Sequence, residues 1–552
     1  MDNIAHHVPR MAHRQPQTLA IVQPIGMLHQ GRLPYRHFTF QELHRETDRL
    51  ALGLEKIGLR RGMRTVLMVP PSLEFYALTF ALFKLGAVIV LIDPGMGVKN
   101  LGVCLKEADP VAFIGVPKAH LGRVLLGWAR SSIKLCVTVG YRMGWEGVTL
   151  EQVRRGARMK EPYRMAETAA ADQAAILFTS GSTGVAKGVV ATHSIFANQL
   201  EMLRGLYHIE PGEIDLPTFP LFGLFAPALG ITAVIPQMDP TRPAHVNPQR
   251  IIAAIHHFGV TNLFGSPALI QRVGRYGEAH GVKLPTLRRV ISAGAPVPAS
   301  AIARFCSLLN DGVQVHTPYG ATEALPVSSI GSAEILGETA QRTAQGGGVC
   351  VGRPVPGMLA KIIRTTDEPI AQWQDELEVS PGEIGEITVA GTGVTTSYFN
   401  RPQSTVLAKI ADGHGGVYHR MGDLGYFDPQ GRLWFCGRKA HRVITPEAIY
   451  YTIPCEGVFN AHAAVYRTAL VGVPRAGVMK PVLCVEREKG TSLSGAQLRA
   501  ELLQLGAAHP HTRAIQTILF HPSFPVDIRH NAKIFREKLA TWAATKLSAG
   551  AP

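Results

Sequence analysis

The stretch Thr179-Ser-Gly-Ser-Thr-Gly-Val-Ala-Lys-Gly-Val189 follows directly on the apolar run Ala174-Ala-Ile-Leu-Phe178. The apolar run predicts a short buried strand, and the stretch after it predicts a loop of glycine and hydroxyl residues that ends on Lys187. Glycines allow positive φ angles and let backbone N–H groups approach an anion closely. The hydroxyls add further donors, and the lysine adds a mobile positive charge that suits phosphate. The sequence therefore predicts a polyphosphate-binding loop.

This loop differs from the Walker pattern, because Gly188 and not a hydroxyl residue follows the lysine. Turns rich in serine and glycine are also common on protein surfaces, and a solvent-exposed turn is the alternative interpretation. We favour the phosphate loop because the hydroxyls, glycines and lysine directly follow a buried strand. The residues assigned to phosphate binding are Thr179, Ser180, Gly181, Ser182, Thr183, Gly184 and Lys187.

The composition is that of a globular protein. With 552 residues, of which 46% are hydrophobic and 18% charged, the chain has room for roughly three or four domain-sized units. Its seven cysteines are scattered and form no C-x-x-C pair, which argues against a zinc site or a disulfide framework. Reduced thiols and a start without a secretory signal predict a cytoplasmic protein.

The chain is strongly basic, with a formal net charge of +15. Nucleic acid, acidic lipid and acidic proteins are the partners that such a charge suggests. The Lys and Arg residues are dispersed and no basic run with interleaved aromatics occurs, so we expect no nucleic-acid binding. A solvated basic surface, attraction of an anionic substrate, and contacts with acidic proteins or membranes all remain open. The charge alone does not decide the function.

The order of helix-like and strand-like stretches predicts an α/β fold. Between residues 40 and 330 they alternate, as a parallel α/β sheet requires. Phe40 to Ile57 has the apolar spacing of a helix that packs on a core. Phe75 to Ile92 is the most membrane-like stretch, but Lys84 and Gly86 interrupt it. A buried helix followed by a strand is expected there, and no transmembrane segment. Gly-rich turns between short strands predict a largely antiparallel subdomain at 340–436.

Further motifs follow the loop in a fixed order along the chain. They are Val290-Ile-Ser-Ala-Gly-Ala-Pro296, Tyr319-Gly-Ala-Thr-Glu-Ala324, Gly382-Glu-Ile-Gly-Glu-Ile387, Tyr398-Phe-Asn-Arg-Pro402, Gly422-Asp-Leu-Gly425 and Gly437-Arg-Lys439. Together with the loop, this series resembles the adenylate-forming superfamily, which contains acyl-CoA synthetases, peptide-synthetase adenylation domains and luciferases. The matches run from Thr179 to Lys439.

The resemblance implies a fold and a domain division. It implies a large N-terminal domain, residues 1–438, with two doubly wound, mainly parallel sheets and a small β-barrel-like subdomain at 340–436. It also implies a smaller, mobile α+β domain at 439–552, joined by a swivel near Arg438 to His441. Ala440 stands where this family usually has Asp or Lys. A hinge needs only accessible backbone angles, so we still expect rotation, although the usual second pose is in doubt.

The resemblance also implies the first chemical step and its residues. A carboxylate attacks the α-phosphorus of ATP, releases pyrophosphate and forms an acyl adenylate, a transfer that depends on positioning and charge neutralisation. By resemblance, Lys187 and its loop hold the β- and γ-phosphates, and Thr322 contacts the α-phosphate. Glu323 holds Mg²⁺, a hard cation that prefers carboxylate oxygen. Lys533 bridges the carboxylate and the α-phosphate as negative charge builds between them.

The nucleotide's base and sugar have their own expected contacts. The adenine lies between Tyr319 and the turn Gly294-Ala295-Pro296, and Asp423 accepts hydrogen bonds from the ribose hydroxyls with Arg438 nearby. Gly320 and Ala321 complete the ATP-binding set. Lys533 is placed by Pro525 to Leu539, which resembles the family's last motif with Asn531-Ala532 in place of its usual Ser-Gly. An amphipathic surface segment is the alternative there.

Departures from the family pattern concentrate on the second half-reaction. Gly223, in Phe219-Pro-Leu-Phe-Gly223, replaces a histidine or aromatic residue that often lines the acyl or thiol path. His441 to Glu447 replaces a glycine-containing loop that helps to build the pantetheine tunnel in CoA ligases, and Ala440 replaces the hinge charge. Phe219, Phe222 and Gly223 are assigned to the substrate pocket.

With the stretch Met238 to Ala244, these departures resemble one subgroup, the β-lactone synthetases of bacterial long-chain olefin biosynthesis. That resemblance implies ATP and Mg²⁺ as requirements, no CoA, and a long-chain 2-alkyl-3-hydroxy acid as substrate. The substrate's own hydroxyl would close a β-lactone and expel AMP. It also implies assembly with other enzymes of that pathway. The alternative is a long-chain fatty acyl-CoA ligase or acyl-AMP ligase.

Overall fold

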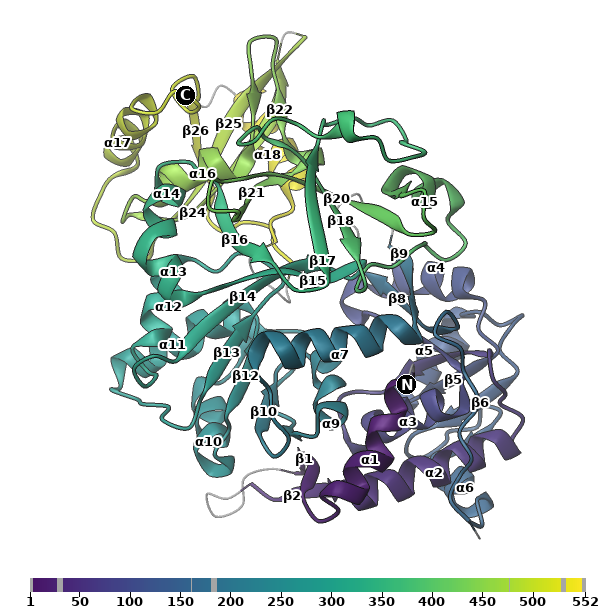
Figure 1. The fold of residues 1–552 in the computed structure, drawn as a ribbon. Helices are drawn as coiled ribbons and strands as arrows, with labels where there is room; N and C mark the ends of the chain where they lie inside the picture. Colours follow the sequence, from purple (N-terminus) through teal and green to yellow (C-terminus); the bar gives the residue numbers. More distant parts are fainter. Residues whose placement is uncertain are drawn as a thin grey trace.

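A computed structural model describes residues 3–26, 33–159, 161–179, 186–475, 477–527 and 533–548. Two large sheets and their helices make up most of the molecule (Figure 1). The seven-stranded sheet lies beside the N-terminus at the lower right of the view. The fourteen-stranded sheet runs from the lower middle to the top, where the C-terminal segment packs. The predicted α/β class is therefore confirmed.

The seven-stranded sheet has the order β7-β6-β5-β3-β4-β8-β9. Its pairs are parallel except that of β8 and β9. Its strands are β3 (Arg64–Met68), β4 (Val88–Ile92), β5 (Ala112–Gly115), β6 (Leu135–Thr138), β7 (Val148–Thr149), β8 (Gln173–Thr179) and β9 (Lys187–Thr192). Helices that precede or connect them are α1 (His7–Arg14), α2 (Phe40–Lys56), α3 (Leu73–Leu85), α4 (Val98–Ala108), α5 (Pro117–Leu126) and α6 (Leu150–Gly156).

The fourteen-stranded sheet contains a parallel part that runs from β14 through β13, β12, β10 and β11 to β1. Its strands are β1 (Leu19–Pro24), β2 (Tyr35–Thr39), β10 (Ile214–Pro217), β11 (Thr232–Val234), β12 (Asn262–Gly265), β13 (Arg289–Ser292) and β14 (Gln314–Ala321). The helices of this part are α7 (His193–Tyr207), α8 (Pro220–Gly223), α9 (Phe225–Leu229), α10 (Pro248–Phe258), α11 (Pro267–Ala279) and α12 (Ala299–Cys306). Strand β2 closes this end of the sheet in antiparallel pairing with β1.

The predicted antiparallel region continues the same sheet beyond β14. Its strands are β15 (Ala324–Gly331), β16 (Val349–Pro354), β17 (Met358–Ile363), β18 (Gly385–Gly391), β19 (Lys409–Ala411), β20 (Val417–Phe427) and β21 (Leu433–Arg438). All of their pairings are antiparallel. Helices α13 (Ser332–Glu334), α14 (Ala340–Ala344) and α15 (Pro402–Ala408) lie in the connections.

After Arg438 the chain forms a separate group of elements with its own core. The strands are β22 (Val443–Ile444), β23 (Ile449–Tyr450), β24 (Val465–Arg475), β25 (Val478–Arg487) and β26 (Thr517–Phe520), and the helices are α16 (Thr452–Asn460), α17 (Gly495–Ala507) and α18 (Arg536–Ser548). The α+β class of this segment agrees with the predicted fold, whereas the domain boundary at 438 and the swivel stay predictions.

The membrane-like stretch has the buried position that its sequence predicts. It contains α3 and β4, whose apolar side chains lie in the core. The interrupting Lys84 is fully buried, where its ammonium forms an ion pair with Asp48 and donates to Thr47 (2.7 Å). No helix in the described part of the chain is long and apolar enough to cross a membrane.

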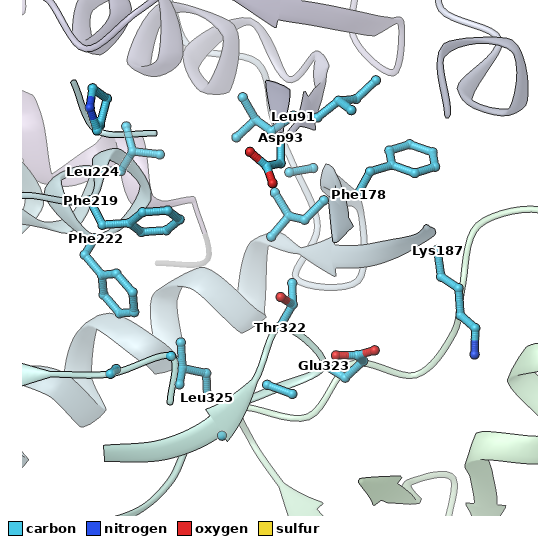
Figure 2. A pocket seen from close by; sticks show the side chains of 18 of the residues that line it. Leu91, Asp93, Phe178, Lys187, Phe219, Phe222, Leu224, Thr322, Glu323 and Leu325 are labelled. Carbon is cyan, nitrogen blue, oxygen red and sulfur yellow. The ribbon is translucent and has the colours of Figure 1, made fainter. Parts of the chain in front are cut away.

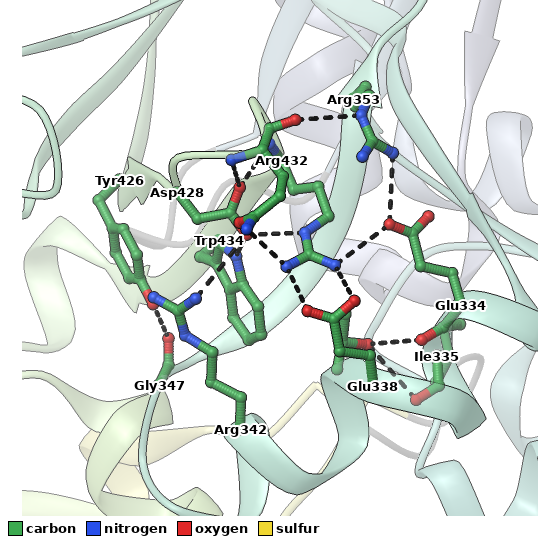
Figure 3. A network of polar contacts seen from close by, with 12 residues as sticks. Glu334, Ile335, Glu338, Arg342, Gly347, Arg353, Tyr426, Asp428, Arg432 and Trp434 are labelled. Carbon is green, nitrogen blue, oxygen red and sulfur yellow. Dashed lines mark hydrogen bonds and ion pairs between the residues drawn. The ribbon is translucent and has the colours of Figure 1, made fainter.

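A buried polar network fixes the turn of the β20–β21 hairpin (Figure 3). The guanidinium of Arg432 donates to Asp428 (2.7 Å) and to both carboxylate oxygens of Glu338 (2.8 and 3.0 Å). The indole N–H of Trp434 donates to the same oxygen of Asp428 at 2.8 Å. Because Asp428 is fully buried, its charge depends on these donors.

Replacing Arg432 by methionine should lower the free energy of unfolding by about 3 kcal/mol, because a buried carboxylate loses its main counter-charge. Urea unfolding followed by tryptophan fluorescence measures this change. Glu338→Gln is the matched control, since the Glu338 side chain is 68% exposed and its ion pair is screened by solvent. Equal destabilisation by the two variants would contradict this account of the network.

Candidate active site

One cavity of about 1140 Å³ brings together most of those predicted site residues that the structure describes. It exceeds the roughly 300–1,000 Å³ that is usual for small-molecule pockets. The predicted residues in its wall are Lys187, Phe219, Phe222, Gly294, Gly320, Ala321, Thr322, Glu323, Arg438 and Lys533. In Figure 2, Phe219 and Phe222 lie on one side of Thr322, and Lys187 lies on the other side together with Phe178. The cavity thus has an apolar part and a polar part that meet at Thr322.

Other predicted residues lie outside this wall or outside the described chain. Gly223, Ala295, Pro296, Tyr319 and Asp423 do not line the cavity. Ser180, Gly181, Ser182, Thr183 and Gly184 lie outside the described residues, as do Asn531 and Ala532. Thr179 ends β8 and pairs in register with Lys187 at the start of β9. The two ends of the predicted phosphate loop are therefore held together by the β8–β9 hairpin.

Lys187, Tyr398 and Glu323 form a compact polar group at the cavity wall. The Lys187 ammonium lies 5.0 Å from the centre of the Tyr398 ring, within cation–π range. The Tyr398 hydroxyl donates to Oε1 of Glu323 at 2.6 Å. Burial and the neighbouring Glu323 raise the pKa of Tyr398, so this tyrosine stays a donor. The Lys187 ammonium and the Glu323 carboxylate therefore lie in the same polar part of the cavity wall.

The residues of this polar space fit a magnesium ion that arrives with a nucleotide. Glu323 offers a carboxylate, of which one oxygen is bound by Tyr398. Among the described residues, no group of three His, Cys, Asp or Glu side chains could hold a metal by itself. Magnesium commonly binds through one or two carboxylates together with substrate phosphates. Glu323 therefore suits a nucleotide-borne Mg²⁺.

Asp423 is held for hydrogen bonding at the other end of the site. It lies opposite Arg438 in the β20–β21 pairing, with 3.0 Å between Oδ1 and the guanidinium. The Tyr319 hydroxyl donates to Oδ2 at 2.7 Å. Burial raises the pKa of Asp423, and Arg438 opposes this rise. Among the described residues, no donor hydrogen bonds to Oδ1 with good geometry. A buried carboxylate oxygen with unused acceptor capacity suits the hydroxyls of a ribose.

The predicted adenine contacts come from neighbouring parallel strands. The turn Gly294-Ala295-Pro296 follows β13, and Tyr319 lies near the end of β14, which pairs with β13 in parallel. Gly294 has a φ of +99°, a conformation that favours glycine and allows the turn. Ligands of α/β sheets bind at the carboxyl ends of such strands. The sandwich of adenine between the turn and Tyr319 stays a prediction.

Lys533 reaches the cavity from the C-terminal segment. Val526 and Ile534 form an antiparallel bridge, and the N–H of Asp527 donates to the carbonyl of Lys533 at 2.9 Å. Lys533 lines the cavity, and its positive charge contributes to lowering the pKa of Asp423 against the effect of burial. The C-terminal segment is therefore seated so that this lysine faces the nucleotide end of the site.

Three further residues of this site have no role that the sequence predicts. Tyr398 was part of a recognised motif but had no assigned role. Lys409 donates to the carbonyl of Thr395, whose N–H donates to the carbonyl of Glu323 at 2.8 Å, so this lysine supports the Glu323 backbone. Burial lowers the pKa of Lys409 to about 7. His419 is its register partner on β20 and lines the cavity, and burial holds the pKa of His419 well below its usual value.

Gly223 is explained by its packing. A Cβ at this position would overlap the hydroxyl of Tyr76 and lie 3.0 Å from Cγ of Pro217. Tyr76 is fully buried in α3. Tyr76 therefore closes the space beside Gly223, where the family resemblance predicts a histidine or an aromatic residue.

Gly223→Ala should destabilise the protein by about 1–3 kcal/mol, because overpacking forces neighbouring side chains to shift. Adding Tyr76→Phe removes the overlapping hydroxyl and should restore a part of that loss. Urea unfolding of the two single variants and the double variant measures the coupling. Strictly additive effects would show that the tyrosine hydroxyl is not what excludes a side chain at Gly223.

Comparison with known proteins assigns the class. Residues 8–399 match the AMP-binding enzyme family. The chain belongs to this family and is an adenylate-forming enzyme of the AMP-forming ligase type. It is 51% identical over 549 residues to the olefin beta-lactone synthetase of Xanthomonas campestris pv. campestris, covering 98% of this chain and 97% of that protein. The olefin beta-lactone synthetase of Stenotrophomonas maltophilia is also 51% identical, over 552 residues, with 99% and 98% covered.

A solved structure supports the fold independently. The amide bond synthetase McbA from Marinactinospora thermotolerans superposes with a TM-score of 0.79, covering 98% of this chain and 99% of that one. At 21% sequence identity, this likeness shows the fold alone. The predicted family and fold are thus confirmed.

Proposed function

We propose that this enzyme is an ATP-dependent olefin β-lactone synthetase that acts on long-chain 2-alkyl-3-hydroxyalkanoic acids. The observation that carries this proposal is the 51% identity to olefin beta-lactone synthetases over nearly the full length of both chains. Two features of the site support it. The cavity joins a polar end to an extensive apolar region, and Tyr76 closes the position that CoA ligases fill with histidine or an aromatic residue.

In the first half-reaction, a carboxylate oxygen of the acid attacks the α-phosphorus of ATP and the bond to the β-phosphate oxygen breaks. Lys187 neutralises charge on the leaving pyrophosphate, and Thr322 positions the α-phosphate. Lys533 stabilises the negative charge that is shared by the carboxylate and the phosphate. Asp423 accepts from the ribose hydroxyls and thereby fixes the nucleotide. When bound, Mg²⁺ would be held by Glu323 and would neutralise phosphate charge.

In the second half-reaction, the substrate's 3-hydroxyl oxygen attacks the acyl carbon of the adenylate. The ester C–O bond of the lactone forms, the acyl–phosphate bond breaks, and AMP leaves as the hydroxyl loses its proton. Because nucleophile and electrophile belong to one molecule, proximity replaces the binding of a second substrate. This step requires no CoA. We further propose that the enzyme is cytoplasmic, which its seven free cysteines support, and that it assembles with other enzymes of olefin synthesis.

The test uses Mg·ATP and a synthetic 2-alkyl-3-hydroxy fatty acid, with and without CoA. We expect AMP, pyrophosphate and a β-lactone identified by NMR in both reactions, at equal rates. Strict dependence of turnover on CoA, with an acyl-CoA product, would overturn the proposal. That outcome would favour the second candidate, a long-chain acyl-CoA ligase.

A further inference from the structure

We infer that the cavity holds the two alkyl chains of its acid in two separate branches, one on each face of the seven-stranded sheet. The new site is the branch on the face of α4 and α5, and its ligand is a long alkyl chain. The inference rests on the proposed function, because a 2-alkyl-3-hydroxy acid carries two long chains on adjacent carbons.

Strand alternation shows that the cavity reaches both faces of the sheet. Successive residues of a strand point to opposite faces. In β4, Leu91 packs in the core that contains α3, whereas Ile92 packs in the core that contains α4. In β8, Leu177 and Phe178 divide in the same way. All four side chains line the cavity, so it passes around the carboxyl ends of these strands.

The sheet topology explains why there is space at this edge. Strand β3 lies between β5 and β4. The helix after β3 is α3, which packs in the core on one face, whereas α4 and α5, which follow β4 and β5, contribute to the core on the other face. Connections that leave neighbouring strands toward opposite faces open a crevice at the carboxyl ends of the strands. Such switch points are where α/β sheets bind ligands.

The first branch lies on the α3 face and contains the residues predicted for the substrate. Phe75 and Thr79 of α3, Phe196 of α7 and Phe225 of α9 line it. Phe219 and Phe222 continue it toward Thr322, as Figure 2 shows. This branch is long and apolar, and one alkyl chain fills it.

The second branch is also apolar and lies between α4 and α5. Leu101 of α4, Ala119 of α5 and Trp128 line it. A Cβ added at Gly102 or Gly122 would lie 3.2 Å from the Trp128 ring, so these two glycines let the indole pack between the helices. An apolar wall excludes phosphate and amide groups, which would lose their hydrogen bonds to water there. An alkyl chain is the ligand that such a wall fits.

The second branch opens to the surface, which suits chains of different length. Val98, at the start of α4, lines the cavity although it is 57% exposed, and the exposed Lys118 at the start of α5 lines it as well. Asp93 directly follows Ile92, and Figure 2 shows its carboxylate close to Leu91 and pointing away from Phe178. The two branches therefore diverge close to polar groups, as two chains on adjacent carbons of a hydroxy acid require.

The test uses steric filling of each branch and an adenylation readout. The variants are Ala119→Phe in the second branch and Thr79→Phe in the first. The substrates are an acid with two long chains, the same acid with a methyl group at carbon 2, and the same acid with a methyl group in place of the chain at carbon 3. Pyrophosphate release gives kcat/KM for each pair, so that the result does not depend on lactone formation.

We expect both variants to lower kcat/KM for the two-chain acid at least about tenfold, since displaced methylenes each carry a large penalty in an apolar pocket. For one of the two shortened acids, each variant should keep kcat/KM within about twofold of the wild-type value. That acid should differ between the two variants. If a filled variant fails to fold, Trp128→Ala and Phe225→Ala enlarge the same branches. Each should then shift the preference toward a longer chain at one carbon only.

Identical substrate profiles for the two variants would overturn the second branch. An unchanged kcat/KM of Ala119→Phe for the two-chain acid would overturn it as well. Failure of the proposed function gives a different pattern. If the wild-type enzyme released pyrophosphate from the two-chain acid but formed no lactone, the proposed product would be wrong and the branches would stand. No release from the two-chain acid by the wild-type enzyme would overturn both.

Discussion

Replacing Lys533 by alanine should reduce the rate of pyrophosphate release by at least about a hundredfold, whereas the affinity for ATP should change little. Removing one group that stabilises transition-state charge typically costs about 10²–10³ in kcat. Lys533 lines the cavity beside the bridge of Val526 and Ile534, and its charge acts on Asp423. Because charge builds between the carboxylate and the α-phosphate only during transfer, the lysine contributes mainly to kcat.

Lys538→Ala is the matched control for this prediction. It removes a lysine five residues further along, which is exposed on α18 and packs over Phe535. Adenylation by this variant should equal that of the wild type. Single-turnover pyrophosphate release and equilibrium ATP binding separate the two effects. If Lys533→Ala released pyrophosphate as fast as the wild type, the catalytic role of Lys533 would be wrong.

The sequence predicts the parts of this site that are local. The β8 strand and the start of β9, the turn after β13 and the facing of Asp423 by Arg438 each follow from a short motif with its own backbone requirement. The family resemblance also predicts that distant segments converge, because their motifs are expected to contact the same nucleotide. The structure brings Lys187, Thr322, Arg438 and Lys533 to one cavity in agreement with this prediction.

The sequence predicts less well the residues that act through tertiary packing. Lys409 and His419 lie in no motif, and only the pairing of β19 with β20 puts them side by side. Gly223 was recognised as a departure, but its cause, the hydroxyl of Tyr76, lies far away in the sequence on α3. The second branch also depends on the face of the sheet on which each connecting helix packs. The periodicity within one segment does not determine that face.

With a substrate analogue that lacks only the 3-hydroxyl, the enzyme should carry out a single adenylation and then stop. A 2-alkyl fatty acid retains the carboxylate and both chains, so it should still fill the apolar branches and react with ATP. Its adenylate then has no internal nucleophile. We expect a burst of about one equivalent of pyrophosphate per enzyme and almost no further release, because formation of the lactone ring is what releases AMP.

Quenched-flow measurement of pyrophosphate, with the hydroxy acid as the matched control, distinguishes the two behaviours. The hydroxy acid should show steady turnover without CoA, whereas the deoxy acid should stop after its burst whether or not CoA is added. A CoA ligase would behave differently, because thiol attack needs no hydroxyl on the substrate and would release AMP continuously. Sustained, CoA-dependent turnover of the deoxy acid, at a rate like that of the hydroxy acid, is therefore incompatible with intramolecular ring closure. The hydroxyl, and not an external thiol, is the group on which release of the acyl chain depends in the mechanism proposed for this site.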